Sequence, residues 1–302
     1  RILIVYRYSN IFFLALYSSL EYSLISLINL YPLRYIRVAL YSSICGTCNC
    51  NLFRAKPFPQ FSQRILTSNL PVIFAITPTY KRIVQKADLI QIANTFRQVP
   101  SFHWIVVEDA INKTNLVRNV LRMSGIRYTH LCIKTPAEVT KSKGALQRNM
   151  ALSWLRYTFS AGKAPAGVVY FADDDNTYTL ELFEEMRYTK KVSVWPVGLA
   201  GGLRYESVKV NKDGKVVGWK VKYAPTRPFA IDMAGFAVNL NLILENPKAL
   251  FQINAKGGYL EPSFLIDVVQ MKDLEPKANN CTKVGFGRFK QANPIGLDVK
   301  KL

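Results

Sequence analysis

Residues 167–177 read GVVYFADDDNT, so five apolar residues run directly into the carboxylates of Asp173, Asp174 and Asp175. Adjacent anions repel, and a folded chain keeps such a cluster only where a cation lies against it or solvent screens it. Carboxylate oxygens at a strand end are hard ligands suited to Mg²⁺ or Mn²⁺, which can bridge to the phosphates of a nucleotide. The alternative is a solvated loop in which Asp175 or Asn176 caps the helix that follows. The triplet alone leaves both interpretations open.

The chain before the triplet alternates between short apolar runs and helical patterns. Strands are expected at residues 70–76, 102–107, 128–133 and 168–172, and helices around 89–96 and at 114–124 and 144–159. Because each run is apolar on both faces, the pattern indicates an α/β fold with a parallel sheet. Ligands bind beyond the carboxyl ends of such strands, so the polar residues at 78–80, 108–109 and 173–175 are expected to converge on one rim.

The pattern changes beyond residue 190. A strand is expected at 192–197, and the signal NKDG at 211–214 predicts a hairpin between 203–210 and 215–223. A strand at 235–240 with a short helix behind it and a helical segment at 261–271 complete the second half. No Gly/Ser linker separates the halves. We therefore expect one mixed, mainly parallel sheet system that joins a nucleotide half (67–190) to an acceptor half (191–284).

Composition bounds the classes of partner. The 302 residues are 49% hydrophobic, which indicates a globular protein, and 40 Lys+Arg against 20 Asp+Glu leave a net charge of +20. This charge favours anionic partners without choosing among them. No run of five basic residues and no recognised binding motif is present, so nucleic acid is not expected as a partner. The absence of a Walker A or GxGxxG loop after the first strand disfavours P-loop NTPases and ordinary dinucleotide enzymes.

Residues 1–66 show neither clear strand nor clear helix periodicity. Residues 11–33 are long enough to cross a bilayer, but Glu21 lies in their middle and Ser and Tyr dilute them. A degraded signal anchor with its stem and a mispredicted sequence are both open interpretations. The segment CGTCNC at 45–50 has no nearby matching cysteine pair, so zinc binding is not expected there.

Seven segments together resemble glycosyltransferase family 43, the β-1,3-glucuronosyltransferases. They are TPTY (77–80), VVEDA (106–110), LQRNMAL (146–152), YFADDDNTYTLELFEEMR (170–187), GGLRYE (201–206), RPFAIDMAGFAVN (227–239) and YLEPSFL (259–265). The resemblance covers about residues 68–284, and the segments stand in the family's order.

The resemblance implies a GT-A type fold and an inverting, Mn²⁺-dependent transfer of glucuronic acid from UDP-glucuronic acid. The acceptor would be the 3-hydroxyl of a terminal galactose on a glycan, either the Gal-Gal-Xyl proteoglycan linker or an N-acetyllactosamine glycan. The family also implies a homodimer held in the Golgi membrane by a single type II anchor, with the catalytic domain in the lumen.

On the donor side, the resemblance assigns a role to each matching residue. Asp175 matches the aspartate that binds Mn²⁺, and Asp173 and Asp174 match neighbours that contact the ribose and the donor sugar. Tyr80 and Asp109 match the residues that stack on and hydrogen-bond the uracil. Arg148 matches a donor-contacting arginine, and Lys143 stands where the family more often has arginine, which keeps the charge but loses the planar fork.

On the acceptor side, Glu261 matches the catalytic base, and Glu206, Arg227 and Asp232 match residues that bind the terminal galactoses. Tyr223 stands where a sugar-stacking tryptophan is expected and keeps a smaller stacking face. Without the family, Glu206 and Arg227 read as surface charges, Tyr223 as a strand core residue, and Glu261 as a helix N-terminal acid favoured by the dipole.

The resemblance ends near Val284. The family continues there through a tryptophan, a histidine and arginines that hold the diphosphate, whereas this chain reads GFGRFKQANPIGLDVKKL and has no later histidine. Residues 285–302 are therefore expected to form an atypical tail. A catalytically impaired member that acts as a glycan-binding protein stays open as the alternative function.

Overall fold

The computed structural model describes residues 4–8, 11–15, 70–139, 144–160, 162 and 164–283. Contacts divide the chain into two units, residues 1–50 and 51–302. In the first unit, β1 (Ile4–Tyr8) and β2 (Ile11–Ala15) form an antiparallel pair. Three expectations fall outside the described residues. They concern the CGTCNC segment, the part of a possible anchor at 11–33 that follows β2, and the tail 285–302. No helix in the described part of the chain is long and apolar enough to cross a membrane.

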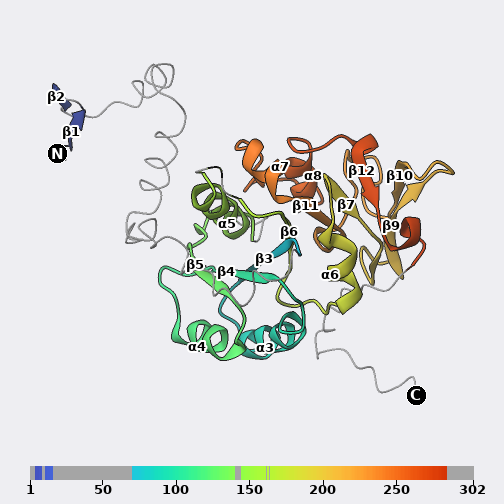
Figure 1. The fold of residues 1–302 in the computed structure, drawn as a ribbon, viewed down its shortest axis with the longest axis horizontal. Coiled ribbons are helices and arrows are strands. Elements are labelled where there is room, and N and C mark those ends of the chain that lie inside the picture. Colours follow the sequence, from blue (N-terminus) through green and yellow to red (C-terminus); the bar gives the residue numbers. More distant parts are fainter. Residues whose placement is uncertain are drawn as a thin grey trace. The chain divides into compact units, whose positions relative to one another are not determined.

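A seven-stranded sheet organises the second unit, with the order β12-β7-β11-β6-β3-β4-β5 (Figure 1). Its strands are β3 (Val72–Thr79), β4 (Phe102–Glu108), β5 (Tyr128–Cys132), β6 (Gly167–Phe171), β7 (Val192–Val194), β11 (Phe236–Asn239) and β12 (Leu274–Pro276). The pairs β3–β4, β4–β5, β3–β6 and β7–β12 are parallel, and β11 is antiparallel to both of its neighbours. The predicted mixed, mainly parallel α/β fold is confirmed.

Helices cover both faces of this sheet, which explains why its strands lack polar alternation. On one face lie α3 (Gln85–Phe96), α4 (Asn115–Ser124) and α6 (Leu180–Arg187), packed on side chains such as Ile73 and Trp104. On the other face lie α5 (Ala145–Thr158), α7 (Leu240–Glu245) and α8 (Leu260–Leu265), packed on side chains such as Phe74 and Phe171. Figure 1 shows α5 on one side of β3 and β4, with α3 and α4 on the other.

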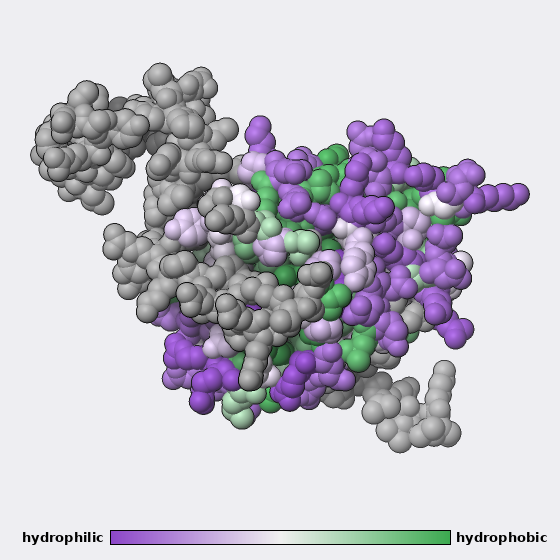
Figure 2. All heavy atoms as spheres, in the orientation of Figure 1, coloured by the Kyte–Doolittle hydropathy of each residue, from purple (hydrophilic) through white to green (hydrophobic). Residues whose placement is uncertain are grey.

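A separate antiparallel sheet contains β8 (Val197–Gly198), β9 (Tyr205–Val210) and β10 (Val216–Lys220), so the predicted hairpin at 211–214 is confirmed. Its exposed residues include Lys209, Lys212, Lys215 and Lys220. Hydrophilic side chains accordingly predominate over the region of β9 and β10 in Figure 2. This basic surface agrees with the expectation of an anionic partner.

Besides the strand expected at 215–223, which ends at Lys220 as β10, three expected elements differ from the observed ones. The strand expected at 192–197 is split into β7 and β8, because Pro196 lies at the break and lacks the N–H that a sheet ladder needs. The first strand continues beyond residue 76 to Thr79. Only β4 pairs with that extension, so Pro78 sits at an edge position where a proline is tolerated.

The helix expected at 261–271 is the third difference, since α8 ends at Leu265. The backbone N–H groups of Val268 and Val269 both donate to the carbonyl of Leu265, which closes the turn. The two consecutive β-branched residues also lower the helix propensity of this segment slightly. A short 3₁₀ turn, η4 (Met271–Asp273), then leads into β12, and α9 (Ala278–Cys281) follows.

The topology places two kinds of segment on one rim. The chain passes from β3 to β4 and β5 on one side and then crosses to β6 on the other, which makes the β3/β6 boundary a topological switch point. Because β11 runs antiparallel, its beginning lies where the neighbouring strands end. The 3₁₀ turn η3 (Met233–Gly235) and the preceding Asp232 therefore come to the same rim from the second half of the chain.

Candidate active site

Two of the three consecutive aspartates meet arginines of the chain itself. The Nη2 of Arg148, on α5, donates to Oδ1 of Asp173 at 2.5 Å. The Nη1 of Arg82, between β3 and α3, donates to Oδ2 of the buried Asp174 at 2.8 Å. Burial raises the pKa of Asp174, and its bonds to Arg82 and Thr79 oppose this effect. The repulsion within the triplet is thus relieved partly by protein cations.

Asp175 differs from its neighbours because it is exposed and pairs with no described cation. Among the described residues, no three His, Cys, Asp or Glu side chains gather closely enough to hold a metal ion. One open carboxylate fits an Mg²⁺- or Mn²⁺-like ion that takes its remaining ligands from water and substrate phosphates. The capping alternative is wrong, because Thr179, and neither Asp175 nor Asn176, occupies the N-cap position of α6.

Tyr80 and Asp109 lie side by side at the ends of β3 and β4. The backbone N–H of Asp109 donates to the carbonyl of Thr79 at 2.8 Å. The ring of Tyr80 is 53% exposed, and Oδ1 of Asp109 accepts from the N–H of Thr135 at 2.8 Å. An exposed aromatic ring beside a fixed carboxylate acceptor suits a planar base with N–H donors, as the sequence predicts for uracil.

A buried carboxylate holds the loop that carries Asp109. Glu108 accepts from Oγ1 and N of Thr114 at 2.7 and 2.8 Å and lies 2.6 Å from Nε2 of His130. Burial pushes the pKa of Glu108 upward, but the hydrogen bonds from His130 and Thr114 outweigh it and lower the pKa. The sequence pattern places Glu108 among the polar residues of the rim, but it does not predict that this carboxylate holds the loop through Thr114 and His130.

The N-terminal end of α5 positions Arg148. Gly144 precedes the helix with a φ of +78°, and a Cβ there would stand 2.6 Å from Nη1 of Arg148. Asn149 exchanges two hydrogen bonds of 2.8 Å with the backbone of Phe251, which ties α5 to the segment ahead of α8. Lys143, the other predicted donor contact, lies outside the described residues.

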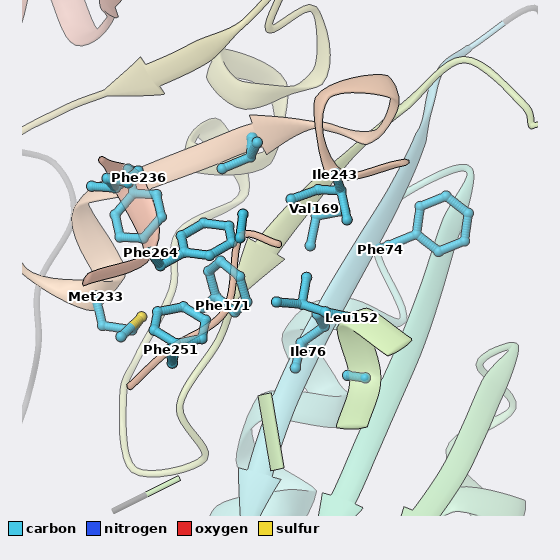
Figure 3. Close-up of a cluster of buried hydrophobic side chains, with 14 of the residues drawn as sticks. Phe74, Ile76, Leu152, Val169, Phe171, Met233, Phe236, Ile243, Phe251 and Phe264 are labelled. Atoms are coloured by element: carbon cyan, nitrogen blue, oxygen red, sulfur yellow. The ribbon is translucent and has the colours of Figure 1, made fainter. Parts of the chain in front are cut away.

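Glu261 lies in the first turn of α8, which an aromatic cluster anchors. Phe264 is fully buried, stacks on Phe251 with ring centroids 4.6 Å apart, and meets Phe171 at the end of β6 edge-on at 5.5 Å (Figure 3). Burial raises the pKa of Glu261 from 4.5 to about 7. The charge of Asp232 acts in the same direction, and those of Arg148 and Arg227 oppose it. Charged residues of both the donor side and the acceptor side therefore influence the pKa of this carboxylate.

Glu206, Arg227 and Asp232 gather on the acceptor side. Glu206 and Arg227 are 6% and 5% exposed, so the alternative that they are surface charges is wrong. Burial and the charge of Asp232 raise the pKa of Glu206, while Arg227 opposes the shift. Asp232 accepts from the N–H of Ala234 at 2.9 Å. Within the described residues, the buried Nε of Arg227 has no hydrogen-bond acceptor, which is the kind of donor that a ligand hydroxyl satisfies.

Comparison with known proteins decides the family. The model of glycosyltransferase family 43 matches residues 92–288. The chain belongs to glycosyltransferase family 43. Galactosylgalactosylxylosylprotein 3-beta-glucuronosyltransferase 1 of Homo sapiens is 54% identical over 245 residues, covering 78% of this chain and 73% of that protein. Galactosylgalactosylxylosylprotein 3-beta-glucuronosyltransferase 2 of Homo sapiens is 55% identical over 219 residues, covering 71% and 68%.

Among solved structures, S. aureus TarS 1-349 in complex with UDP-GlcNAc aligns with this family 43 chain at a TM-score of 0.45 and 13% identity. The alignment covers 74% of this chain and 59% of that one. The sequence resemblance to the family is confirmed by the family model and by the relatives, and the mainly parallel sheet agrees with the GT-A type of fold that it implies.

Tyr223 of this family 43 chain is not a strand core residue. It follows the end of β10 and is 54% exposed, and its hydroxyl donates to the carbonyl of Gly257 at 3.3 Å. Gly258, with a φ of +81°, leaves room for the ring, since a Cβ there would stand 2.6 Å from Cε1 of Tyr223. An exposed ring fixed at its edge, beside the buried Arg227, is suited to stacking on a sugar.

Proposed function

We propose that this family 43 chain is a glucuronosyltransferase that moves glucuronic acid from UDP-glucuronic acid to the 3-hydroxyl of a terminal galactose. The Gal-Gal-Xyl linker is the proposed acceptor, because the similar human proteins are named for it. The observation that carries the proposal is the position of Glu261. This carboxylate, with a pKa of about 7, stands among acceptor-side residues and within the field of the donor-side Arg148.

In the proposed reaction, Glu261 acts as the general base. It takes the proton of the galactose 3-hydroxyl, whose oxygen attacks the anomeric carbon from the face opposite UDP, so that the configuration inverts. A base with a pKa near the working pH is partly ionised and still accepts a proton effectively. A single displacement requires no nucleophilic serine or cysteine.

Asp175 is the residue proposed to hold Mn²⁺, which when bound would neutralise charge on the departing diphosphate. The other donor-side residues act by position. Arg148 pairs with Asp173 just beyond the end of β6. We propose that its cation also contacts the nucleotide phosphates. Tyr80 and Asp109 hold the uracil base of the donor at the ends of β3 and β4. Together these groups fix the leaving group at the switch point while Glu261 faces it from the second half.

Glu206, Arg227 and Asp232 are proposed to bind the galactose. The carboxylates of Glu206 and Asp232 accept hydrogen bonds from sugar hydroxyls, and the buried Nε of Arg227 donates one to a hydroxyl oxygen. Tyr223 stacks on the sugar ring.

A homodimer and a type II Golgi membrane protein with a lumenal catalytic domain are proposed from the family alone. Light scattering of the purified chain tests the first proposal, and imaging of the expressed chain with a Golgi marker tests the second.

Transfer separates the proposed enzyme from the glycan-binding alternative. The purified chain is incubated with UDP-glucuronic acid, Mn²⁺ and a Gal-β1,3-Gal acceptor, and the product is detected by mass spectrometry. The proposal predicts a glucuronylated acceptor and released UDP. Binding of the acceptor without any product would instead support the glycan-binding alternative.

Gly201→Ala is expected to weaken acceptor binding through Glu206. A Cβ at Gly201 would stand 1.9 Å from Oε1 of Glu206, so the carboxylate must move away from the galactose site. We expect the KM for the acceptor to rise about tenfold, the cost of one lost charged hydrogen bond, with the KM for UDP-glucuronic acid unchanged.

Gly202→Ala is the matched control for this substitution. Gly202 also has a positive φ, +74°, so alanine meets the same backbone strain, but no atom lies within 4 Å of the added Cβ. Its acceptor KM should stay near that of the wild-type protein. Equal effects of the two substitutions would mean that backbone strain, and not the position of Glu206, controls acceptor binding.

A further inference from the structure

One arginine joins three elements at the switch point. Arg82 donates from Nη1 to Asp174 at 2.8 Å, and from Nη2 and Nε to Oδ2 of Asp88 at 2.6 and 3.2 Å. Its Cζ lies 4.9 Å from the centroid of the Tyr80 ring. The guanidinium thus connects the end of β3 with α3 and, across the strand boundary, with the end of β6.

These contacts are largely shielded from water. The side chains of Arg82, Asp88 and Asp174 are 15%, 9% and 8% exposed. Charge-assisted hydrogen bonds in such surroundings are strong and directional, so the carboxylate of Asp174 has little freedom to turn. The guanidinium lies over the Tyr80 ring, yet Tyr80 is 53% exposed, so the side chain is not fully covered by Arg82.

We propose that Arg82 is a positioning residue for the nucleotide, because one guanidinium orients both the ring that stacks on the base and the carboxylate at the end of β6. The two parts of the donor site are thereby coupled: disturbing one loosens the other. This inference rests on the proposed function, which assigns the open surface of Tyr80 to the nucleobase. Arg82 itself need not touch the nucleotide.

The planar fork is the property that this role requires. Three N–H groups of the guanidinium serve two carboxylates, and its Cζ lies over the aromatic ring, 4.9 Å from the centroid. A lysine ammonium keeps the charge beside Asp174 but lacks both the fork and the flat face. Arg82→Lys should therefore restore only part of the function that Arg82→Ala removes, whereas a purely electrostatic role would let lysine restore nearly all of it.

The test is the affinity of the folded chain for UDP with saturating Mn²⁺, measured by calorimetry. Arg82→Ala is expected to raise the Kd about tenfold, the usual effect of losing a charged hydrogen bond, with Arg82→Lys in between. Asp88→Asn, which loosens Arg82 from α3, is expected to raise the Kd about threefold. The control is Arg97→Ala, at the C-terminal end of α3. It loses a 2.9 Å bond to the carbonyl of Ser124 and should leave the Kd unchanged.

A double-mutant cycle tests the coupling. In the wild-type background, the fold-change in Kd caused by Tyr80→Leu and Asp174→Asn together should be smaller than the product of the two single fold-changes. In the Arg82→Ala background, the fold-change of the pair should equal that product. The inference is overturned if Arg82→Ala and Asp88→Asn bind UDP like the wild-type protein. If the wild-type chain itself fails to bind UDP, the proposed function falls too, so the two failures are distinguishable.

Discussion

Replacing Glu261 by glutamine is expected to lower kcat about a thousandfold, because the amide cannot accept the proton of the attacking hydroxyl. Glutamine has nearly the same size and keeps hydrogen-bonding groups, so the KM values for donor and acceptor should change little. Steady-state kinetics with UDP-glucuronic acid and a galactose acceptor measure both effects. The control is Glu245→Gln, an exposed glutamate at the end of α7, which should behave like the wild-type enzyme.

The pH dependence of kcat/KM provides a second test of Glu261 as the general base. The base must be ionised, and its pKa is about 7, so kcat/KM of the wild-type enzyme should fall about tenfold per pH unit below pH 7. The residual activity of Glu261→Gln should lack this acidic limb. An acidic limb that persists in the variant would assign the titration to another group.

As the pH rises through 7, the contribution of Glu261 to the stability of the fold should fall, whereas the activity should rise. The pKa of Glu261 is raised in the folded state from 4.5 to about 7, so its protonation favours folding below pH 4.5, and that contribution is lost as the pH rises through 7. Above pH 7 the folded protein carries a poorly solvated anion that glutamine removes. Glu261→Gln should therefore have a higher Tm than the wild-type protein at pH 8. A lower Tm would indicate that the activity is lost through misfolding.

Asp175→Ala is expected to lower the rate of transfer at least a hundredfold and to remove stimulation by Mn²⁺, because the ion would lose the protein ligand proposed for it. Asp175 is exposed and pairs with no described cation, so its truncation should change the free energy of unfolding by less than about 0.5 kcal/mol. The decisive readout is UDP affinity. Mn²⁺ should tighten UDP binding to the wild-type chain but not to Asp175→Ala.

Asp213→Ala provides the control for metal dependence, since this exposed aspartate lies in the β9–β10 hairpin. Its UDP affinity should respond to Mn²⁺ as that of the wild-type protein does. Undiminished tightening by Mn²⁺ in Asp175→Ala would place the ion elsewhere and remove Asp175 from the site.

The position of the polar residues on one rim of the sheet could be predicted from the sequence, because the strands are short apolar runs that end in polar residues. In a parallel sheet, the ends of β3, β4 and β6 must lie together, and this brings Tyr80, Asp109 and Asp173 into one region. The helices followed from periodicity in the same way, with Leu89 and Phe96 buried on the face expected. These features depend on local pattern alone.

Other features depend on contacts that no local pattern encodes. Asp232 reaches the rim only because β11 runs antiparallel to its neighbours. The short sequence of β11 does not indicate whether that strand pairs in a parallel or an antiparallel direction. Arg82 stands in a connecting segment without periodicity, and its partner Asp174 is 92 residues away. The raised pKa of Glu261 likewise arises from burial beside the cluster around Phe264, which forms only when the halves pack together.

The most direct test of the central claim is the structure of the product. NMR of the acceptor after incubation of the wild-type chain with UDP-glucuronic acid, Mn²⁺ and a Gal-β1,3-Gal acceptor shows which hydroxyl is modified and with which anomeric configuration. Glu261 acting as base in one inverting displacement predicts a β-linked glucuronic acid on O3 of the terminal galactose. An α-linked product, or folded protein that binds UDP and acceptor but forms no product, would contradict it.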